Sequence, residues 1–161
     1  MEESLLNQII SKTRLNGRTS IAYSSLADSM QVNITNGKHM WISDEPASYQ
    51  GNDLAPNPVE LLMGSLAACT VVTILKKAKE ADIVISSIAV ACGYTRMLDP
   101  KNPDPTAFPQ KVKLTKSIML PDISDESLIS QIKSFADNCP VESILTSELL
   151  INTEFAEIVR N

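Results

Sequence analysis

The stretch that decides the fold is NPVELLMGSLAACTVVTILKKA, residues 57–78. Asn57 is a favourable N-cap, Pro58 suits the first helical position, and Glu60 stands where the acid of a capping box belongs. Behind Glu60 the sequence is apolar on nearly every side of a helix, up to the lysines at its end. A helix without a polar face is a buried one. We therefore expect a long helix that is covered on several sides.

Shorter elements precede and follow this helix. Before the long helix, the patterns predict an amphipathic helix over 2–15, a hairpin with strands over 31–35 and 38–43 joined by Asn36-Gly37, and a loop over 44–56. After it, they predict a strand over 83–97 with both faces at least partly covered, a loop over 98–110, and a strand over 112–120 with one wet face. The chain is then predicted to form a helix capped by Ser124, a short helix opened by Pro140, and a last strand over 149–155. The predicted class is α+β, with strands on either side of a buried helix. Without repeats or linkers, we expect one domain over residues 1–161, in which residues 1–16 form an N-terminal helical extension.

Charge and composition narrow the range of partners. The 161-residue chain has a formal net charge of −5 and no basic block, which argues against nucleic acid, whose phosphates require clustered Lys and Arg. Glu2 and Glu3 stand where a secretory signal would be positive, and we expect no apolar run that approaches the roughly 18 residues of a membrane helix. We expect a cytoplasmic protein without a membrane partner, in a compartment that keeps thiols reduced.

Metal and hydrolase chemistry are poorly supported. The three cysteines, Cys69, Cys92 and Cys139, are separated by 23 and 47 positions, and the chain has a single histidine, His39. That spacing is not typical of a zinc site, so we expect no metal and no cofactor. A hydrolase using Ser65 or His39 is a distant possibility, because no G-x-S-x-G motif is present.

Two of the cysteines could carry thiol chemistry. Cys69 lies in the middle of the long helix, with Ser65 and Thr73 four residues to either side on the same stripe. Taken alone it is best interpreted as a small hydrophobic residue in a core. Cys139 precedes Pro140 at a helix N-terminus, where peptide dipoles favour the reactive thiolate. The residues by themselves thus favour Cys139 as the reactive thiol, and Cys92 as core.

Three segments together resemble the OsmC/Ohr family. They are Asp-Glu-Pro at 44–46 before a Gly- and Asn-containing loop, NPVELL at 57–62 running on through SLAACT at 65–70, and ADNCPV at 136–141. Their order, and the interval of 70 residues between Cys69 and Cys139, are also similar to that family.

The resemblance implies a fold and an activity. The implied fold is an intertwined homodimer in which β-sheets wrap central helices. The implied activity is the reduction of organic hydroperoxides in oxidative-stress defence, with Cys69 as the attacking thiol and Cys139 as the resolving thiol. The cysteines would pass through a sulfenic acid and a disulfide, and an external dithiol would restore them.

The resemblance also implies a charged pair beside the attacking cysteine. In the peroxidases of the family an arginine serves this cysteine and is positioned by a glutamate ten residues before it. Here that place is Val59, and Glu60 stands one residue later. Glu60 and Arg18 are therefore the candidates, with Arg96 as the other arginine. This departure places the chain closer to the general OsmC-like branch than to the dedicated organic hydroperoxide enzymes.

A second function remains open at this point. The chain could be a non-enzymatic dimer of the same fold that binds a hydrophobic or acyl ligand, or that senses redox state. The departure at Val59 favours this alternative, whereas the intact pair of cysteines favours the peroxidase.

Overall fold

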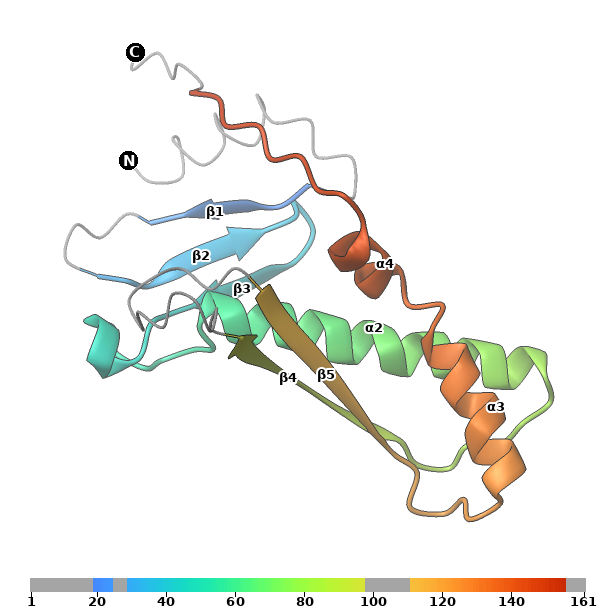
Figure 1. The fold of residues 1–161 in the computed structure, drawn as a ribbon. Coiled ribbons are helices and arrows are strands. Elements are labelled where there is room, and N and C mark those ends of the chain that lie inside the picture. The colour runs from blue at the N-terminus through green and yellow to red at the C-terminus, as the bar shows by residue number, and fades with distance from the viewer. Residues whose placement is uncertain (1–18, 25–28, 98–110, 156–161) are drawn as a thin grey trace. The chain divides into compact units, whose positions relative to one another are not determined.

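The structure is a computed structural model that describes residues 19–24, 29–97 and 111–155. Its elements, in chain order, are β1 (Ile21–Tyr23), β2 (Val32–Thr35), β3 (Met40–Ser43), the 3-10 helix η1 (Ala47–Tyr49), α2 (Pro58–Glu80), β4 (Ala89–Met97), β5 (Lys111–Met119), α3 (Glu126–Ala136) and α4 (Pro140–Thr146) (Figure 1). This mixture of helices and strands confirms the α+β class. The chain forms two compact units, the first of residues 1–61 with 150–161 and the second of residues 62–149. The predicted helix over 2–15 and loop over 98–110 lie outside the described residues.

The first unit holds a three-stranded antiparallel sheet in the order β1-β2-β3. The predicted hairpin is confirmed as β2–β3, although its second strand begins at Met40, two residues later than expected, and strand β1 was not predicted. Thr35 pairs with Met40, so the connection has four residues. The Asn36 side chain accepts hydrogen bonds from the N–H groups of Lys38 (3.0 Å) and His39 (2.8 Å), which holds both residues in the turn.

The loop after β3 is built around a buried carboxylate. Asp44 is 1% exposed, and its two oxygens accept hydrogen bonds from the backbone N–H groups of Glu45, Asn52 and Leu54 at 2.9–3.2 Å. Gly51 packs against the Glu45 backbone so closely that a Cβ there would lie 1.7 Å from the carbonyl oxygen. These contacts give the loop over 44–56 a fixed shape.

The start of α2 is as predicted. The Asn57 side chain accepts hydrogen bonds from the N–H groups of Val59 and Glu60, both at 3.0 Å. The Glu60 carboxylate in turn accepts one from the Asn57 N–H at 2.9 Å. This is a complete capping box, so the helix start is fixed by residues within one turn of it.

The burial of α2 differs from the prediction. One stripe of the helix is buried, formed by Met63, Leu66, Thr70, Ile74 and Ala78. Val72, in contrast, is 64% exposed, and Leu62 and Leu75 are also exposed. The expectation of a helix covered on several sides is therefore wrong for the single chain, whose core reaches one stripe only. By length and composition α2 could also cross a membrane, contrary to our expectation that no apolar run was long enough, but the core helix of a soluble protein meets the same criteria.

Strand β4 begins at Ala89, six residues later than predicted. Asp82, with a φ of 56°, ends α2 in the left-handed region, and the Ile83 N–H donates to the Ala78 carbonyl at 2.8 Å. This is a Schellman-type end, so the backbone of Ile83 serves the helix instead of a sheet. Coverage of both strand faces is also wrong, because only Val90 and Cys92 in β4 are half-buried.

The core of the second unit lies among α2, α3 and the β4–β5 pair. Its centre is Ile74 with Ile132 and Ala136, and Ile118 of β5 packs against them. Strand β5 has the predicted wet face, but its other face is covered only toward the end of the strand, because Val112 and Leu114 are exposed. The N-cap of α3 is Asp125, not Ser124 as predicted, because the Asp125 side chain accepts a hydrogen bond from Leu128 N–H at 3.0 Å.

The end of the chain contains one correct and one wrong prediction. Pro140 opens α4 as expected, with Cys139 as the N-cap. The predicted strand over 149–155 is not formed, and Leu150 and Phe155 are almost fully exposed. The alternating pattern is present, but a strand also needs a partner for its backbone groups, and none pairs with these residues in the described part of the chain.

Candidate active site

Cys69 is half-buried on α2 and opens into a surface pocket of about 450 Å³. The pocket is lined by Ala68, Cys69, Val72, Thr73, Lys76, Lys77, Asn138 and Pro140. Its wall beside Cys69 is apolar, and two lysines stand at one end. Of the two hydroxyl residues predicted to share the Cys69 stripe, Thr73 lines the pocket, whereas Ser65 is exposed and does not. A small molecule in this pocket would meet the Cys69 sulphur.

Cys139 is the buried partner of Cys69. It caps α4, is 1% exposed, and does not line the pocket, although its neighbours Asn138 and Pro140 do. The side chains of Cys69 and of Thr70, the residue after it, lie near enough to the Cys139 sulphur to favour its thiolate. The fold thus brings together two thiols that are 70 residues apart in the sequence.

The surroundings of Cys139 favour its thiolate. Burial alone would raise the pKa of the Cys139 thiol, but the backbone N–H of Glu142, the side chains of Cys69 and Thr70, and the backbone N–H of Val141 outweigh burial, so the pKa is lowered. The sulphur makes no capping hydrogen bond of regular geometry, so the N–H groups at the start of α4 act mainly as nearby dipoles. Cys139 therefore carries the negative charge more readily than a free cysteine does.

A lysine and a glutamate lie next to this pair of thiols. Lys116 of β5 forms an ion pair with Glu142 and donates a hydrogen bond to the carbonyl of Ala136 at 3.3 Å. Lys116 is also the cross-strand partner of Cys92. Burial raises the pKa of the Cys92 thiol, and Lys116 opposes this only partly. The raised pKa makes Cys92 a less reactive thiol than Cys139, but Cys92 is half-buried and lies outside the buried core in which it was predicted.

The other candidates lie elsewhere. The Glu60 carboxylate takes part in the capping box of α2, and Val59 is exposed. Arg18 lies outside the described residues. Arg96 is exposed on β4, opposite Val112, and forms no ion pair with another described residue. The structure therefore does not bring Glu60 or Arg96 into contact with the two cysteines.

His39 is exposed in the connection between β2 and β3. Within the described ranges, no three His, Cys, Asp or Glu side chains are grouped so that they could hold a metal ion.

Sequence reasoning missed Thr70 and Lys116. A signal for Lys116 was present, because it alternates in phase with the half-buried Ile118 and Leu120, which mark the inward side of this segment. A charged residue on the buried side of a strand needs a partner, and such a residue indicates a polar contact inside the protein. Thr70 gave no comparable signal beyond its place next to Cys69.

Comparison with known proteins relates the chain that carries this site to a family. The sequence matches the family model described as OsmC-like protein over residues 51–154. No curated protein matches it significantly.

Solved structures give the same fold at low sequence identity. A protein from Psychrobacter arcticus 273-4, described as an osmotic stress induced and detoxification response protein, is 23% identical with a TM-score of 0.61, over 78% of this chain and 86% of that one. The organic hydroperoxide resistance protein OsmC from Legionella pneumophila is 18% identical with a TM-score of 0.57, over 80% and 89%. The organic hydroperoxide resistance protein OhrB of Bacillus subtilis is 17% identical with a TM-score of 0.56, over 80% and 89%. Because the family model spans well over half of the chain and the folds agree, this protein belongs to the OsmC-like family.

Proposed function

We propose that this protein is a thiol peroxidase that reduces organic hydroperoxides in oxidative-stress defence, with Cys69 as the attacking thiol and Cys139 as the resolving thiol. The observation that carries the proposal is that the two thiols lie near each other, with Cys69 lining a pocket and Cys139 buried. Two of the similar solved structures are of proteins named organic hydroperoxide resistance proteins, which supports the same activity here.

Access decides which thiol meets the peroxide. The pKa of Cys139 is lowered, which by itself would favour Cys139 as the nucleophile. However, Cys139 is 1% exposed and does not line the pocket, whereas Cys69 does. A peroxide in the pocket therefore reaches Cys69 first, and the roles follow from access to the sulphur more than from acidity.

The contact between the thiols also provides for the proton of Cys69. In the proposed mechanism the Cys139 sulphur takes up this proton, because it lies near the Cys69 side chain and its pKa is lowered. As Cys69 attacks the distal peroxide oxygen, its proton passes to Cys139, the O–O bond breaks, and the alkoxide leaves and is protonated by solvent. The product is a sulfenic acid on Cys69 and one molecule of alcohol.

The second half of the cycle closes the disulfide. Cys139, once more as the thiolate, attacks the Cys69 sulphur. The S–S bond forms and the S–O bond breaks, and hydroxide leaves with a proton as water. An external dithiol then reduces the disulfide to two thiols and becomes oxidised itself.

The pocket favours an organic substrate. Ala68 and Val72 present apolar surface beside the sulphur, against which an alkyl group can pack. Hydrogen peroxide has no alkyl group and gains nothing from this surface.

A homodimer is the expected working form, and the cytoplasm the expected location. The exposed apolar residues on α2 form a surface that water would otherwise cover, and a second copy of the chain could bury it. The cytoplasm keeps thiols reduced, as the cycle requires. We expect no nucleic acid or membrane as a partner.

Peroxide consumption tests the proposed activity. Purified protein with dithiothreitol should consume cumene hydroperoxide faster than hydrogen peroxide, and the Cys92→Ser variant, as a matched control, should do the same. Equal rates, or faster use of hydrogen peroxide, would contradict the apolar site.

The ligand-binding alternative has one observation in its favour. In the described part of the chain no arginine contacts Cys69, whereas the family resemblance implies one. If neither cysteine reacts with peroxide while the purified protein retains a bound acyl compound, this second function replaces the first.

A further inference from the structure

Lys116 connects the two helices on either side of Cys139. Its ammonium group donates to the carbonyl of Ala136, the last residue of α3, and is paired with Glu142 in the first turn of α4. The turn that carries Cys139 lies between these two acceptors in the sequence. One side chain from β5 therefore holds both ends of the segment that presents the resolving thiol.

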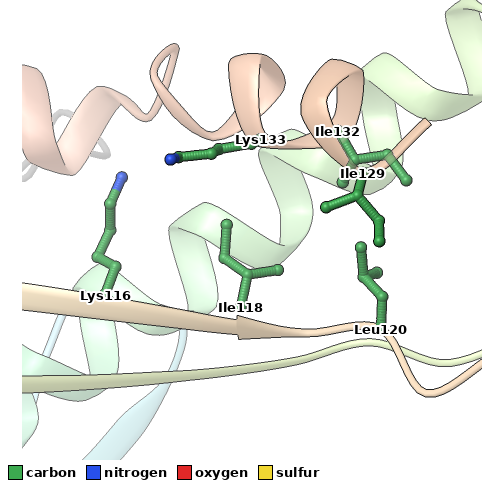
Figure 2. Close-up of a pocket in the computed structure, with 6 residues that line it drawn as sticks. All are labelled: Lys116, Ile118, Leu120, Ile129, Ile132 and Lys133. Atoms are coloured by element: carbon green, nitrogen blue, oxygen red, sulfur yellow. The ribbon is translucent and has the colours of Figure 1, made fainter. Parts of the chain in front are cut away.

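The surroundings make this contact more than a surface ion pair. The Lys116 side chain is 16% exposed and that of Glu142 is 35% exposed, so water screens their attraction only in part. Exposed pairs contribute little because solvent and side-chain entropy offset them. Figure 2 shows Lys116 and Ile118 on β5 and Leu120 just after it, where these side chains face α3 across a pocket of about 230 Å³.

Glu142 transmits the position of Lys116 to the sulphur. The backbone N–H of Glu142 is one of the groups that interact with the Cys139 thiol. If the side chain of Glu142 loses its partner, the first turn of α4 is free to shift, and the sulphur shifts with it. Attack on a sulfenic acid requires the incoming sulphur opposite the S–O bond, and a displacement of about 1 Å can cost roughly a hundredfold in rate.

We propose that Lys116, through Glu142 and the Ala136 carbonyl, is a positioning residue for the resolving step, in which the Cys139 sulphur attacks the Cys69 sulphur. This inference rests on the proposed function and adds the residues that govern its second step. The step itself is balanced as above, with the S–S bond formed, the S–O bond broken and water released. Lys116 touches neither the peroxide nor the reacting sulphurs.

Single-turnover measurements on four variants test the proposal in a Cys92→Ser background. Lys116→Met removes the charge and keeps an apolar stem, Lys116→Arg restores the charge, and Glu142→Gln removes the ion pair from the other side. Lys133→Met is the matched control, because Lys133 lines the same pocket (Figure 2), is exposed, and has no ion pair among the described residues. The two readouts are peroxide consumption in the first turnover and formation of the Cys69–Cys139 disulfide.

The expected result separates the two steps. Lys116→Met and Glu142→Gln should consume the first equivalent of cumene hydroperoxide within about twofold of the parent rate, but form the disulfide about tenfold more slowly and accumulate sulfinic acid on Cys69. Lys116→Arg should recover most of the rate, and Lys133→Met should match the parent. Disulfide formation at the parent rate in Lys116→Met overturns the proposal. An equal loss in both steps also overturns it, because it would indicate a general structural role.

Diamide separates this proposal from the proposed function. It oxidises two neighbouring thiols to a disulfide and is itself reduced to a hydrazine, so no peroxide chemistry is needed. If the parent protein consumes no peroxide, the peroxidase proposal fails, and the diamide rates of the same variants decide on Lys116 alone. Slower closure in Lys116→Met than in Lys133→Met supports the positioning role, and equal closure refutes it.

Discussion

Replacing Cys139 by serine should slow but not abolish the first reaction with peroxide, because Cys69 then gives its proton to solvent, and should stop the cycle at the sulfenic acid of Cys69. In the native protein the buried Cys139 sulphur already lies near the Cys69 side chain, so the resolving step needs no diffusion. Well-oriented groups of this kind reach effective concentrations of about 10⁵ M or more, and even a contact equivalent to about 1 M would outpace an external thiol at about 1 mM by roughly a thousandfold. We therefore expect steady-state turnover of Cys139→Ser to fall at least about a hundredfold.

Mass spectrometry after one equivalent of cumene hydroperoxide, with dimedone present, measures the trapped intermediate. The expected product in Cys139→Ser is a dimedone adduct on Cys69, which is replaced by sulfinic acid when dimedone is left out. Serine is itself a favourable N-cap, so α4 should persist, and circular dichroism checks this. Turnover within a few-fold of the native rate would refute the resolving role. If Cys69→Ser consumed peroxide and its Cys139 were labelled, the two roles would be reversed.

Three further predictions follow from the same structure. The pKa of the Cys139 thiol is lower in the folded than in the unfolded chain, so its ionisation stabilises the fold fully above the unfolded value of about 8.5, and this contribution is lost as the pH falls through the folded pKa. The free energy of unfolding of the native protein minus that of Cys139→Ser should therefore increase as the pH rises toward 8.5 in urea titrations, and a difference independent of pH would contradict the lowered pKa. Gly51→Ala places a Cβ 1.7 Å from the Glu45 carbonyl oxygen and should lower the free energy of unfolding by at least about 1–3 kcal/mol. Gly64→Ala, with open space in α2, should raise the free energy of unfolding by about 0.5–1 kcal/mol. Equal melting temperatures of the two variants would be inconsistent with the loop geometry. Light scattering coupled to gel filtration should give about twice the chain mass of 17.6 kDa, and a folded monomer would exclude the dimer proposal.

Elements governed by their own residues were predictable from the sequence. Asn57 and Glu60 fix the start of α2 within one turn, and Pro140 fixes the start of α4. Where two neighbouring residues can perform the same task, local reasoning failed by one position, as it did for Ser124 and Asp125.

Elements that depend on distant partners were harder to predict. The pattern of residues 149–155 alternates as a strand does, but alternation does not provide the neighbouring strand, and none pairs with it in the described ranges. Strand β4 begins later in the sequence than its pattern indicates, because Ile83 donates its N–H to the end of α2 and not to a sheet. Periodicity describes one element at a time, so it cannot predict which of two elements a backbone group will serve.

The candidate site was predictable in part, and for two different reasons. The local argument identified Cys139 as a thiol at a helix start, and its lowered pKa agrees with that argument. The pairing of Cys139 with Cys69 came only from the resemblance, since nothing in the spacing of two residues 70 positions apart places them in contact. Lys116 was missed because lysines are common on the polar side of β5, and a lysine on the inward side of the strand was not distinguished from them.

The most direct test of the central claim is a map of the disulfides formed in the native protein by one equivalent of cumene hydroperoxide. Proteolysis without reduction, followed by mass spectrometry, identifies which cysteines are linked. The proposed mechanism predicts one linked pair of peptides containing Cys69 and Cys139, with Cys92 still a free thiol and one equivalent of alcohol produced. Cys69 and Cys139 both remaining as thiols, or a link through Cys92, would contradict it.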